Sequence, residues 1–300
     1  SENLNLLPNI AGNVREWIIN PHGNDRRSIL GGAFNTNEYT FNSFYSLNPT
    51  DRSIQNGFRL VKNFANKTEE NDSFNVKHIE RDFDNEIDVS DEVFEVYKSQ
   101  FDYPKASLKV KTLEVKSPNP NYSIEKFEMD PPYSSDEKLY GFIISSKEFK
   151  KKSVPIIEFP TAGAIFSDKI IIDENLLKSR KYLWDEGYSL IIPVYYNNYD
   201  REKPLKSWWP NESEEYKNAI IKIGKDFKRV IDYLETREDL DTKKLSYMGY
   251  SWGSVTSNIL LAIDDRIKSA AIFIGGLMLQ KSRKEIEAHF YLRRIKIPIL

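Results

Sequence analysis

The sequence has 300 residues, 40% of them hydrophobic and 13% aromatic, which suffices for one large domain or two smaller ones with buried cores. The formal net charge of −2, without a basic stripe interleaved with aromatic residues, gives no electrostatic argument for nucleic acid as a partner. No apolar run reaches the roughly 18 residues of a membrane span. The absence of cysteine excludes disulfides and thiolate catalysis, and it fits a reducing, cytoplasmic location.

Both ends of the sequence predict a fragment of a longer protein. The chain starts at Ser1 without a methionine, and residues 294–300 read as a buried strand that is just beginning. A domain ending there would leave backbone groups and apolar side chains without partners. Nothing is therefore expected from the sequence about a signal peptide.

The first 67 residues are rich in Asn, Gly and aromatic residues and predict short, irregular strands. Residues 68–92 are acidic and strongly polar, and we interpret them as a linker, since charge runs are most often solvated. Apolar residues at the end of this stretch predict a docked helix: Ile87, Val89, Val93, Phe94, Val96 and Tyr97.

Residues 93–300 carry the pattern of an α/β domain. Three alternating segments predict an antiparallel entry to a sheet: Leu108–Val115, Tyr122–Met129 and Leu139–Ser145. Apolar strands then alternate with helices: strands Val154–Phe159, Ser189–Tyr195 and Ser269–Phe273, helices Asn175–Glu186 and Tyr216–Thr236, and a helical excursion over 277–292. This order predicts a mostly parallel sheet covered on both faces.

The motif G-x-S-x-G at residues 249–253 lies between an apolar strand, Lys244–Met248, and a helix, Ser254–Ile263. A serine at such a strand–turn–helix junction is the nucleophile elbow of an α/β-hydrolase. Gly249 and Gly253 would allow the close approach of strand and helix that a Cβ prevents. We predict Ser251 as the catalytic nucleophile, against the alternative of an ordinary serine in a turn.

Two backbone N–H groups are predicted to form an oxyanion hole. One belongs to Trp252, at the N-terminus of the helix that follows the serine. The other is expected in residues 160–164, after strand Val154–Phe159, where Thr161 is the predicted donor. Small residues in this loop would let backbone amides approach a ligand.

A general base is harder to assign, because this fold takes its triad in the order serine, acid, histidine. His289 is the only histidine after Ser251, but it precedes the last strand, so we interpret it as a helix-surface residue. Two nearby acids read as members of surface ion pairs: Glu285 and Glu287. Two histidines precede the hydrolase part: His22 and His78. The acid is expected just beyond Leu300 and the histidine further on.

The loop after Tyr195 is long and carries Tyr199, Arg201 and Trp209. Ligands of α/β sheets bind beyond the carboxyl ends of the strands, where this loop begins. These three residues are therefore predicted as a substrate loop. The alternative is that its aromatic residues only pack the loop onto the body of the domain.

From about residue 90 to 300 the chain resembles the α/β-hydrolase superfamily, in particular its acetyl-xylan-esterase-like and prolyl-oligopeptidase-like bacterial members. The resemblance implies Ser251 as nucleophile and Trp252 as oxyanion donor. It also implies that Phe159–Thr161 belongs to the strand-end loop that supplies the second donor.

Three segments near the N-terminus follow the patterns G-N-V-x-E-W, R-G-G-S-W and G-F-R-L-V in order: Ile10–Trp17, Ser28–Phe34 and Gly57–Val61. They resemble the C-terminal part of the formylglycine-generating, or sulfatase-modifying factor, domain, which has a C-type-lectin-like fold. In similar multidomain bacterial proteins a Ser/Thr kinase domain often lies upstream, which this resemblance implies here, although the sequence has no Gly-rich loop, H-R-D or D-F-G motif.

The enzymatic members of that second family bind copper through paired cysteines. The matching positions here are Thr36 and Phe41, so the resemblance implies a binding or scaffold module and no oxidase activity. Asn13 and Glu16 fall where the family places a structural calcium ion, or they satisfy turns.

The sequence thus predicts a partial lectin-like module over residues 1–67, an acidic linker over 68–92 and a C-terminally truncated α/β-hydrolase domain over 93–300. The expected reaction is hydrolysis of a small-molecule carboxylic ester through an acyl-enzyme on Ser251, without a cofactor or metal. The alternatives are a catalytically inactive hydrolase fold that serves as an interaction or sensor domain, a serine peptidase, and a lyase or transferase on the same fold.

Overall fold

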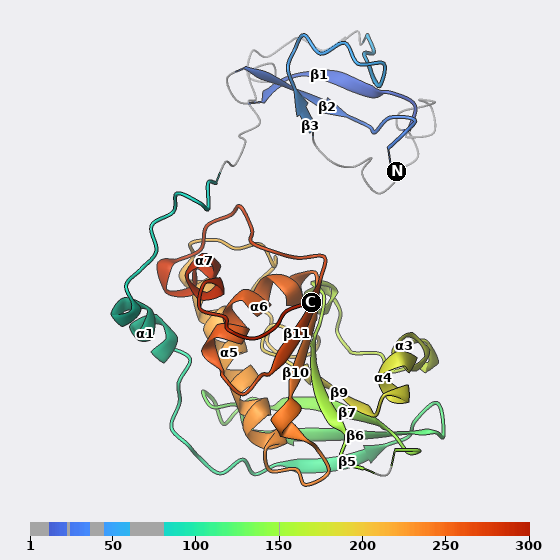
Figure 1. Ribbon diagram of the computed structural model, residues 1–300, viewed down its shortest axis with the longest axis vertical. Coiled ribbons are helices and arrows are strands. Elements are labelled where there is room, and N and C mark those ends of the chain that lie inside the picture. Colours follow the sequence, from blue (N-terminus) through green and yellow to red (C-terminus); the bar gives the residue numbers. More distant parts are fainter. Residues whose placement is uncertain (1–11, 23–24, 37–44, 61–80, 150) are drawn as a thin grey trace. The chain divides into compact units, whose positions relative to one another are not determined.

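A computed structural model describes residues 12–22, 25–36, 45–60, 81–149 and 151–300 (Figure 1). The chain divides into two compact units, Ser1–Arg81 and Asp82–Leu300. Most of the predicted linker, residues 68–80, lies outside the described residues. Within the described parts of the chain no helix is long and apolar enough to cross a membrane.

The N-terminal unit contains a four-stranded sheet in the order β3-β2-β1-β4. Its strands are β1 (Arg15–His22), β2 (Arg26–Leu30), β3 (Tyr45–Leu47) and β4 (Asn56–Gly57). The first three are antiparallel, whereas β4 runs parallel to β1. Ile29 and Ala33 are fully buried, so the short strands enclose a small apolar core.

The C-terminal unit is built on a seven-stranded sheet in the order β11-β10-β8-β9-β7-β6-β5. Its strands are β5 (Lys111–Val115), β6 (Tyr122–Met129), β7 (Leu139–Ser146), β8 (Val154–Phe159), β9 (Tyr188–Val194), β10 (Ser246–Tyr250) and β11 (Ser269–Phe273). The first three form the predicted antiparallel entry, and β8 to β11 form the predicted parallel part. The alternating and the continuous apolar patterns therefore located both halves of the sheet.

Helices lie on both faces of this sheet (Figure 1). They are α1 (Asp91–Ser99), α2 (Gly163–Phe166), α3 (Glu174–Ser179), α4 (Lys181–Asp185), α5 (Glu214–Leu234), α6 (Trp252–Ile263) and α7 (Ala288–Leu292), with 3₁₀ turns at Thr242–Lys244 and Lys284–Ile286. The helix predicted near the end of the linker is present as α1. Its N-cap is Ser90, and its buried Phe94 packs edge-on against Tyr291.

The single helix predicted over Asn175–Glu186 is wrong, because the structure has two short helices that meet at Arg180. The backbone of Arg180 leaves the helical region, with φ of −108° and ψ of 13°. Its guanidinium forms two hydrogen bonds of 3.0 Å with the carboxylate of Glu158 in β8. This bidentate pair explains both the break and the one acidic residue in an otherwise apolar strand.

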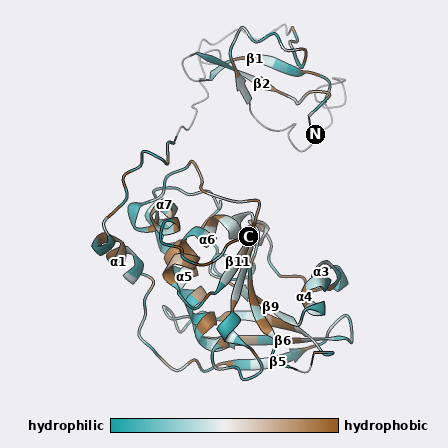
Figure 2. Ribbon diagram, viewed as in Figure 1, coloured by the Kyte–Doolittle hydropathy of each residue, from teal (hydrophilic) through white to brown (hydrophobic). Residues whose placement is uncertain are grey.

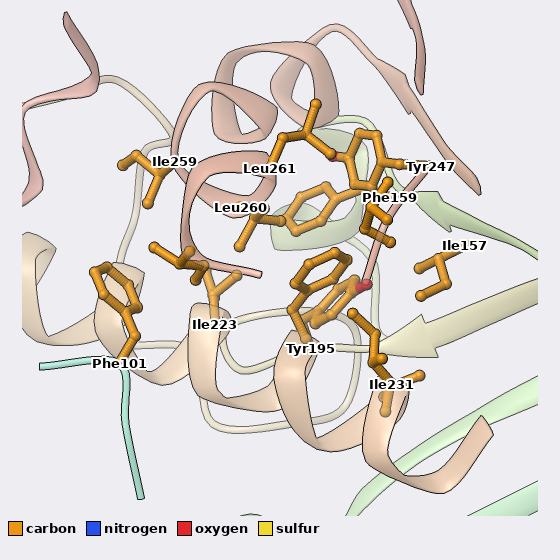
Figure 3. Close-up of a cluster of buried hydrophobic side chains, with 14 of the residues drawn as sticks. Phe101, Ile157, Phe159, Tyr195, Ile223, Ile231, Tyr247, Ile259, Leu260 and Leu261 are labelled. Atoms are coloured by element: carbon orange, nitrogen blue, oxygen red, sulfur yellow. The ribbon is translucent and has the colours of Figure 1, made fainter. Parts of the chain in front are cut away.

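Two apolar clusters cover the two faces of the sheet. The larger one joins α5 and α6 to the strands, and Figure 3 shows Phe159, Tyr195 and Tyr247 among its side chains. The smaller one lies under α3 and α4. The strand between them, β9, is apolar along most of its length (Figure 2). Burial of these side chains is the main favourable term that holds the sheet in place.

The last residues extend the parallel sheet beyond β11. The backbone N–H of Leu300 donates to the carbonyl of Ala270 at 2.9 Å, and the N–H of Ile272 donates to the carbonyl of Leu300 at 3.0 Å. Ala270 and Ile299 form a parallel bridge. The strand expected from the apolar residues 294–300 therefore begins here, later than the sequence suggested.

Candidate active site

Ser251 lies at the turn between β10 and α6, as the G-x-S-x-G motif predicted. Its φ is 51° and its ψ is −107°, a left-handed conformation that is unfavourable for a residue with a side chain. Two backbone hydrogen bonds hold it there. Its N–H donates to the carbonyl of Phe273 at 2.9 Å, and its carbonyl accepts from the N–H of Val255 at 3.0 Å.

The two glycines of the motif have the tight packing that was expected of them. A Cβ on Gly249 would lie 2.7 Å from the carbonyl carbon of Gly253. A Cβ on Gly253 would lie 2.7 Å from the backbone oxygen of Phe159 at the end of β8. Real Cβ atoms do not approach backbone atoms so closely, so the turn depends on glycine at both positions.

The predicted oxyanion loop and the serine leave the same edge of the sheet. β8 and β10 are parallel neighbours with Phe159 opposite Gly249, so residues 160–164 begin beside the elbow. Thr161 is exposed, and its carbonyl accepts a hydrogen bond of 3.1 Å from the N–H of Ala164 at the start of α2. The predicted second donor therefore lies on a loop that begins beside Ser251.

Trp252 occupies the first position of α6, where backbone N–H groups have no partner within the helix. Its side chain is fully buried, and the indole packs edge-on against Phe159 with ring centroids 5.3 Å apart. The indole therefore belongs to the core. Only the backbone of Trp252 is suited to contact a ligand.

Arg201 does not have the position expected of a substrate-loop residue. Its guanidinium lies in the interior, where Nη1 is 2.6 Å from Asp226 Oδ2 and also donates to the carbonyl of Val194 at 3.0 Å. Nη2 donates to the hydroxyl of Tyr133 at 2.7 Å. The guanidinium thus anchors the loop to α5 through Asp226. The sequence alone does not show this contact, because the two residues are distant in the chain.

Tyr199 and Trp209 both lie on this loop, Tyr199 partly buried and Trp209 exposed. The N–H of Tyr199 donates to the carbonyl of Ala164 at 2.7 Å, which fastens it to α2 next to the oxyanion loop. Burial, with the nearby charge of Glu158, raises the pKa of the Tyr199 phenol. Trp209 is 44% exposed and stacks on Trp208 with centroids 4.2 Å apart.

A small, largely enclosed cavity lies close to the elbow, under the segment that follows β11. It is lined by α5, by α6 one turn after Ser251, and by residues of that segment: Pro210, Tyr216, Ile220, Val255, Thr256, Ile259, Leu277, Met278, Gln280, Ser282, Ile286, Glu287 and Ala288. Most of these side chains are apolar, and the cavity, of about 20 Å³, has room for no more than a water-sized group. This cavity was not predictable from the sequence, because its walls come from three separate segments.

The interpretation of His289 as a helix-surface residue is wrong. The side chain is buried in α7, its Nδ1 lies 3.5 Å from Glu86 Oε2, and its ring is 6.0 Å from that of Phe83. Glu287 is buried as well and accepts hydrogen bonds from the N–H and hydroxyl of Ser282 at 2.9 and 3.2 Å. Both were misassigned because their partners are not helix neighbours.

Glu285 fits its expected surface role, with its carboxylate 3.9 Å from Lys217 Nζ. Within the described parts of the chain, no group forms a hydrogen bond with the hydroxyl of Ser251. The histidine contacts that are established lie elsewhere, at Glu86 for His289 and at the hydroxyl of Ser28 for His22. His78 lies outside the described residues.

In the N-terminal unit, the carboxylate of Glu16 binds Arg59, with 2.8 Å between Oε1 and Nη2. The carbonyl of Asn13 accepts a hydrogen bond of 2.8 Å from the N–H of Phe34. These contacts fit the reading in which both residues satisfy local structure. Among the residues that the structure describes, no group of three or more His, Cys, Asp or Glu side chains is arranged to hold a metal ion.

Thr36, at one of the positions matched to a copper-binding cysteine, closes a turn. Its hydroxyl accepts from the N–H of Ala33 at 2.8 Å and lies 2.9 Å from the carbonyl of the same residue. The other matched position, Phe41, lies outside the described residues. A hydroxyl engaged in a turn is no substitute for a thiolate ligand.

Comparison with solved structures gives several esterases of low sequence identity. Acetyl xylan esterase 1 from Thermoanaerobacterium sp. JW/SL YS485 is 11% identical with a TM-score of 0.50, over 69% of this chain and 77% of that one. Acetyl xylan esterase from Paenibacillus sp. R4 is 14% identical with a TM-score of 0.42, over 61% and 58%. Glucuronoyl esterase from Solibacter usitatus is 14% identical with a TM-score of 0.43, over 60% and 56%. The chain thus spans less than two thirds of the latter two proteins.

Comparison with curated protein sequences gave no match. The matched family model, given below, covers no residue of the N-terminal unit. The resemblance of this unit to sulfatase-modifying factor domains therefore stays a prediction, as does the upstream kinase domain. The C-terminal unit has an α/β-hydrolase fold, and its residues 164–300 match the model of the dienelactone hydrolase family.

Proposed function

We propose that the C-terminal unit is a serine hydrolase that cleaves carboxylic esters of small molecules through an acyl-enzyme on Ser251. The observation that carries this proposal is the left-handed conformation of Ser251, with φ of 51°, at the start of α6. Such a conformation costs on the order of 1–3 kcal/mol and is favoured by evolution mainly where function requires it. Glycine is the residue that adopts this conformation without steric cost.

In the proposed reaction, Ser251 Oγ attacks the ester carbonyl while a histidine base takes its proton. The backbone N–H groups of Trp252 and Thr161 stabilise the oxyanion. The alcohol leaves with the proton from the histidine, and water then hydrolyses the acyl-enzyme by the same route in reverse. Following the chain order of this fold, we place the acid and the histidine after Leu300.

One feature supports an ester as the substrate: the family whose model matches residues 164–300 is named for the hydrolysis of a lactone, which is a cyclic ester. Tyr199 and Trp209 are proposed as an outer wall of the substrate site, whereas Arg201 acts only by anchoring their loop.

One observation favours the alternative of an inactive hydrolase fold with an interaction role. His289, the only histidine after Ser251, is buried against Glu86 and Phe83 and is not placed as a base for the serine. A domain that has no general base for Ser251 would keep the nucleophile elbow but would not catalyse hydrolysis. A serine peptidase is the alternative within the hydrolases, and a lyase or transferase would keep the elbow but hydrolyse no ester.

Labelling with a fluorophosphonate and hydrolysis of p-nitrophenyl acetate, both on the natural gene product, separate these proposals. Ser251→Ala should abolish labelling and lower hydrolysis by about 10⁴-fold or more. Ser135→Ala, an exposed serine, is the control and should change neither. Labelling that persists in Ser251→Ala would assign the reactive group elsewhere, and a wild-type protein that neither labels nor hydrolyses would favour the interaction role.

A further inference from the structure

Ile274, the residue directly after β11, combines two unfavourable features. Its φ is 56°, in the left-handed region that β-branched residues avoid. Its side chain is 89% exposed, so it gains nothing from burial within the described parts of the chain. Among the residues that the structure describes, burial therefore does not explain an isoleucine at this position.

Ile274 lies level with the nucleophile. β10 and β11 are parallel neighbours with Tyr250 opposite Phe273. Ser251 and Ile274 directly follow these two residues, so they leave the sheet at the same level. Both have left-handed φ values, 51° and 56°. The hydrogen bond of 2.9 Å from Ser251 N–H to the carbonyl of Phe273 fastens the two strand ends together.

The loop that carries Ile274 is held firmly against α6. A Cβ on Gly275 would lie 2.1 Å from the Cβ of Ser254, so the backbone touches the helix at this point. The side-chain amide of Asn258 donates to the carbonyl of Gly276 at 3.2 Å. The backbone beside Ile274 is therefore fixed at the edge where Ser251 stands, and the side chain itself is exposed.

We infer that Ile274 is a specificity-determining residue, which contacts an apolar group of the ester bound at Ser251. The inference rests on the proposed function and extends it to the substrate class, namely esters that carry an aliphatic or aromatic group beyond acetate. Contact with such a group removes the isoleucine side chain from water. Because the loop is already fixed, binding the substrate costs little conformational entropy at this contact.

The test compares Ile274→Asn and Ile274→Gly with the wild-type natural gene product, since asparagine and glycine both tolerate the left-handed region. Two series of p-nitrophenyl and alkyl esters lengthen the acyl group and the alcohol in turn. In at least one series, kcat/KM for the hexyl member should fall about 10-fold relative to the shortest member. The melting temperature should rise by about 2–4 °C, because the strain is relieved.

Ile87→Asn is the matched control, because Ile87 is 90% exposed but precedes α1, and it should change neither quantity. Unchanged chain-length profiles in both variants, with Ser251→Ala inactive, would overturn the role of Ile274 and leave the proposed function intact. A lower melting temperature would also overturn it, since the side chain would then be packed in the working protein. A wild type without esterase activity would refute both proposals.

Discussion

The guanidinium of Arg201 lies 2.6 Å from the carboxylate of Asp226, and the two side chains are only 4% and 0% exposed. Burial raises the pKa of Asp226, while the charge of Arg201 and a hydrogen bond from the N–H of Tyr196 oppose the rise. The pair joins the loop after β9 to α5. This buried ion pair therefore helps to hold the loop in place, together with the hydrogen bond from the Tyr199 N–H to the carbonyl of Ala164.

Replacing one partner of this pair should lower the free energy of unfolding much more than replacing both. Arg201→Met leaves the carboxylate of Asp226 buried without a counter-ion, which costs about 3–5 kcal/mol of unfolding free energy. The double variant Arg201→Met, Asp226→Leu should recover most of the loss. Urea unfolding of the three proteins measures this difference. A double variant no more stable than Arg201→Met would show that lost packing, and not the unpaired charge, carries the effect.

The close approach of β8 and α6 predicts that an alanine substitution lowers stability at Gly253 but not at Gly163, which lies outside this contact. Gly253→Ala places a Cβ 2.7 Å from the carbonyl oxygen of Phe159, and the forced shift should cost about 1–3 kcal/mol and misplace Ser251. Gly163→Ala is the control, because its Cβ would meet only the hydroxyl of Thr161, at 3.4 Å. Thermal unfolding should separate the two variants clearly. Equal melting temperatures would contradict the tight packing of the elbow.

Ser254 ties the elbow to the end of β11. Its Oγ lies 2.8 Å from the carbonyl of Gly249 and 2.7 Å from that of Phe273, and it accepts from the N–H of Phe273 at 3.0 Å. Ser254→Ala should therefore cost about 1–3 kcal/mol and lower kcat, because it loosens the residue that holds Ser251.

Ser257→Ala is the matched control for Ser254→Ala. The hydroxyl of Ser257 donates only to the helix carbonyl of Ser254, at 2.7 Å, within the described residues. Its loss should lower the unfolding free energy less and leave kcat unchanged. Similar kcat values for the two variants would argue against a role of Ser254 in placing the nucleophile.

The pair of Arg237 and Asp239 predicts a small loss of stability in acid. The side-chain hydrogen bonds of Arg237, two contacts of 2.8 Å, lower the pKa of Asp239 below its ordinary value of 3.8. A carboxylate with a lowered folded-state pKa stabilises the fold above pH 3.8, and this contribution is lost as the pH falls through the folded-state value. Because Asp239 is mostly exposed, the contribution should stay below about 1 kcal/mol.

Unfolding free energies at pH 7 and pH 3 measure this contribution. Asp239→Asn should remove it, so that its difference from wild type is present at pH 7 and smaller at pH 3, below the ordinary pKa of 3.8. Glu238→Gln serves as the control, since Glu238 has no ion pair within the described residues. A difference that persists unchanged at pH 3 would show that the effect does not depend on ionisation of Asp239.

The elements that local sequence determines were predictable. The strand Val154–Phe159 follows from its apolar residues, and the elbow follows from Gly249 and Gly253, whose constraint is local. The break at Arg180 was not predictable, because its helical periodicity is continuous and the partner that decides it, Glu158, belongs to a strand.

Charged and titratable residues were the least predictable part of the site. Arg201 is buried against Asp226, and His289 is buried against Glu86. Both partners are distant in sequence, so the local pattern does not show that these side chains are buried. Glu287 was likewise read from its charged neighbours, although Ser282 binds it in the interior. Periodicity and composition describe a face of a helix, but they do not describe what covers that face.

The pairing of β8 with both β9 and β10 has a consequence for folding. β6 and β7 are joined by a short connection, so their antiparallel ladder can form from local contacts. β8 meets β10 only after β9 and the whole of α5 intervene, which closes a long loop and raises the contact order. The strand edge that holds Ser251 should therefore be completed late in refolding. Recovery of fluorophosphonate reactivity should lag behind recovery of secondary structure, and an incompletely folded chain should carry an antiparallel sheet without a reactive serine.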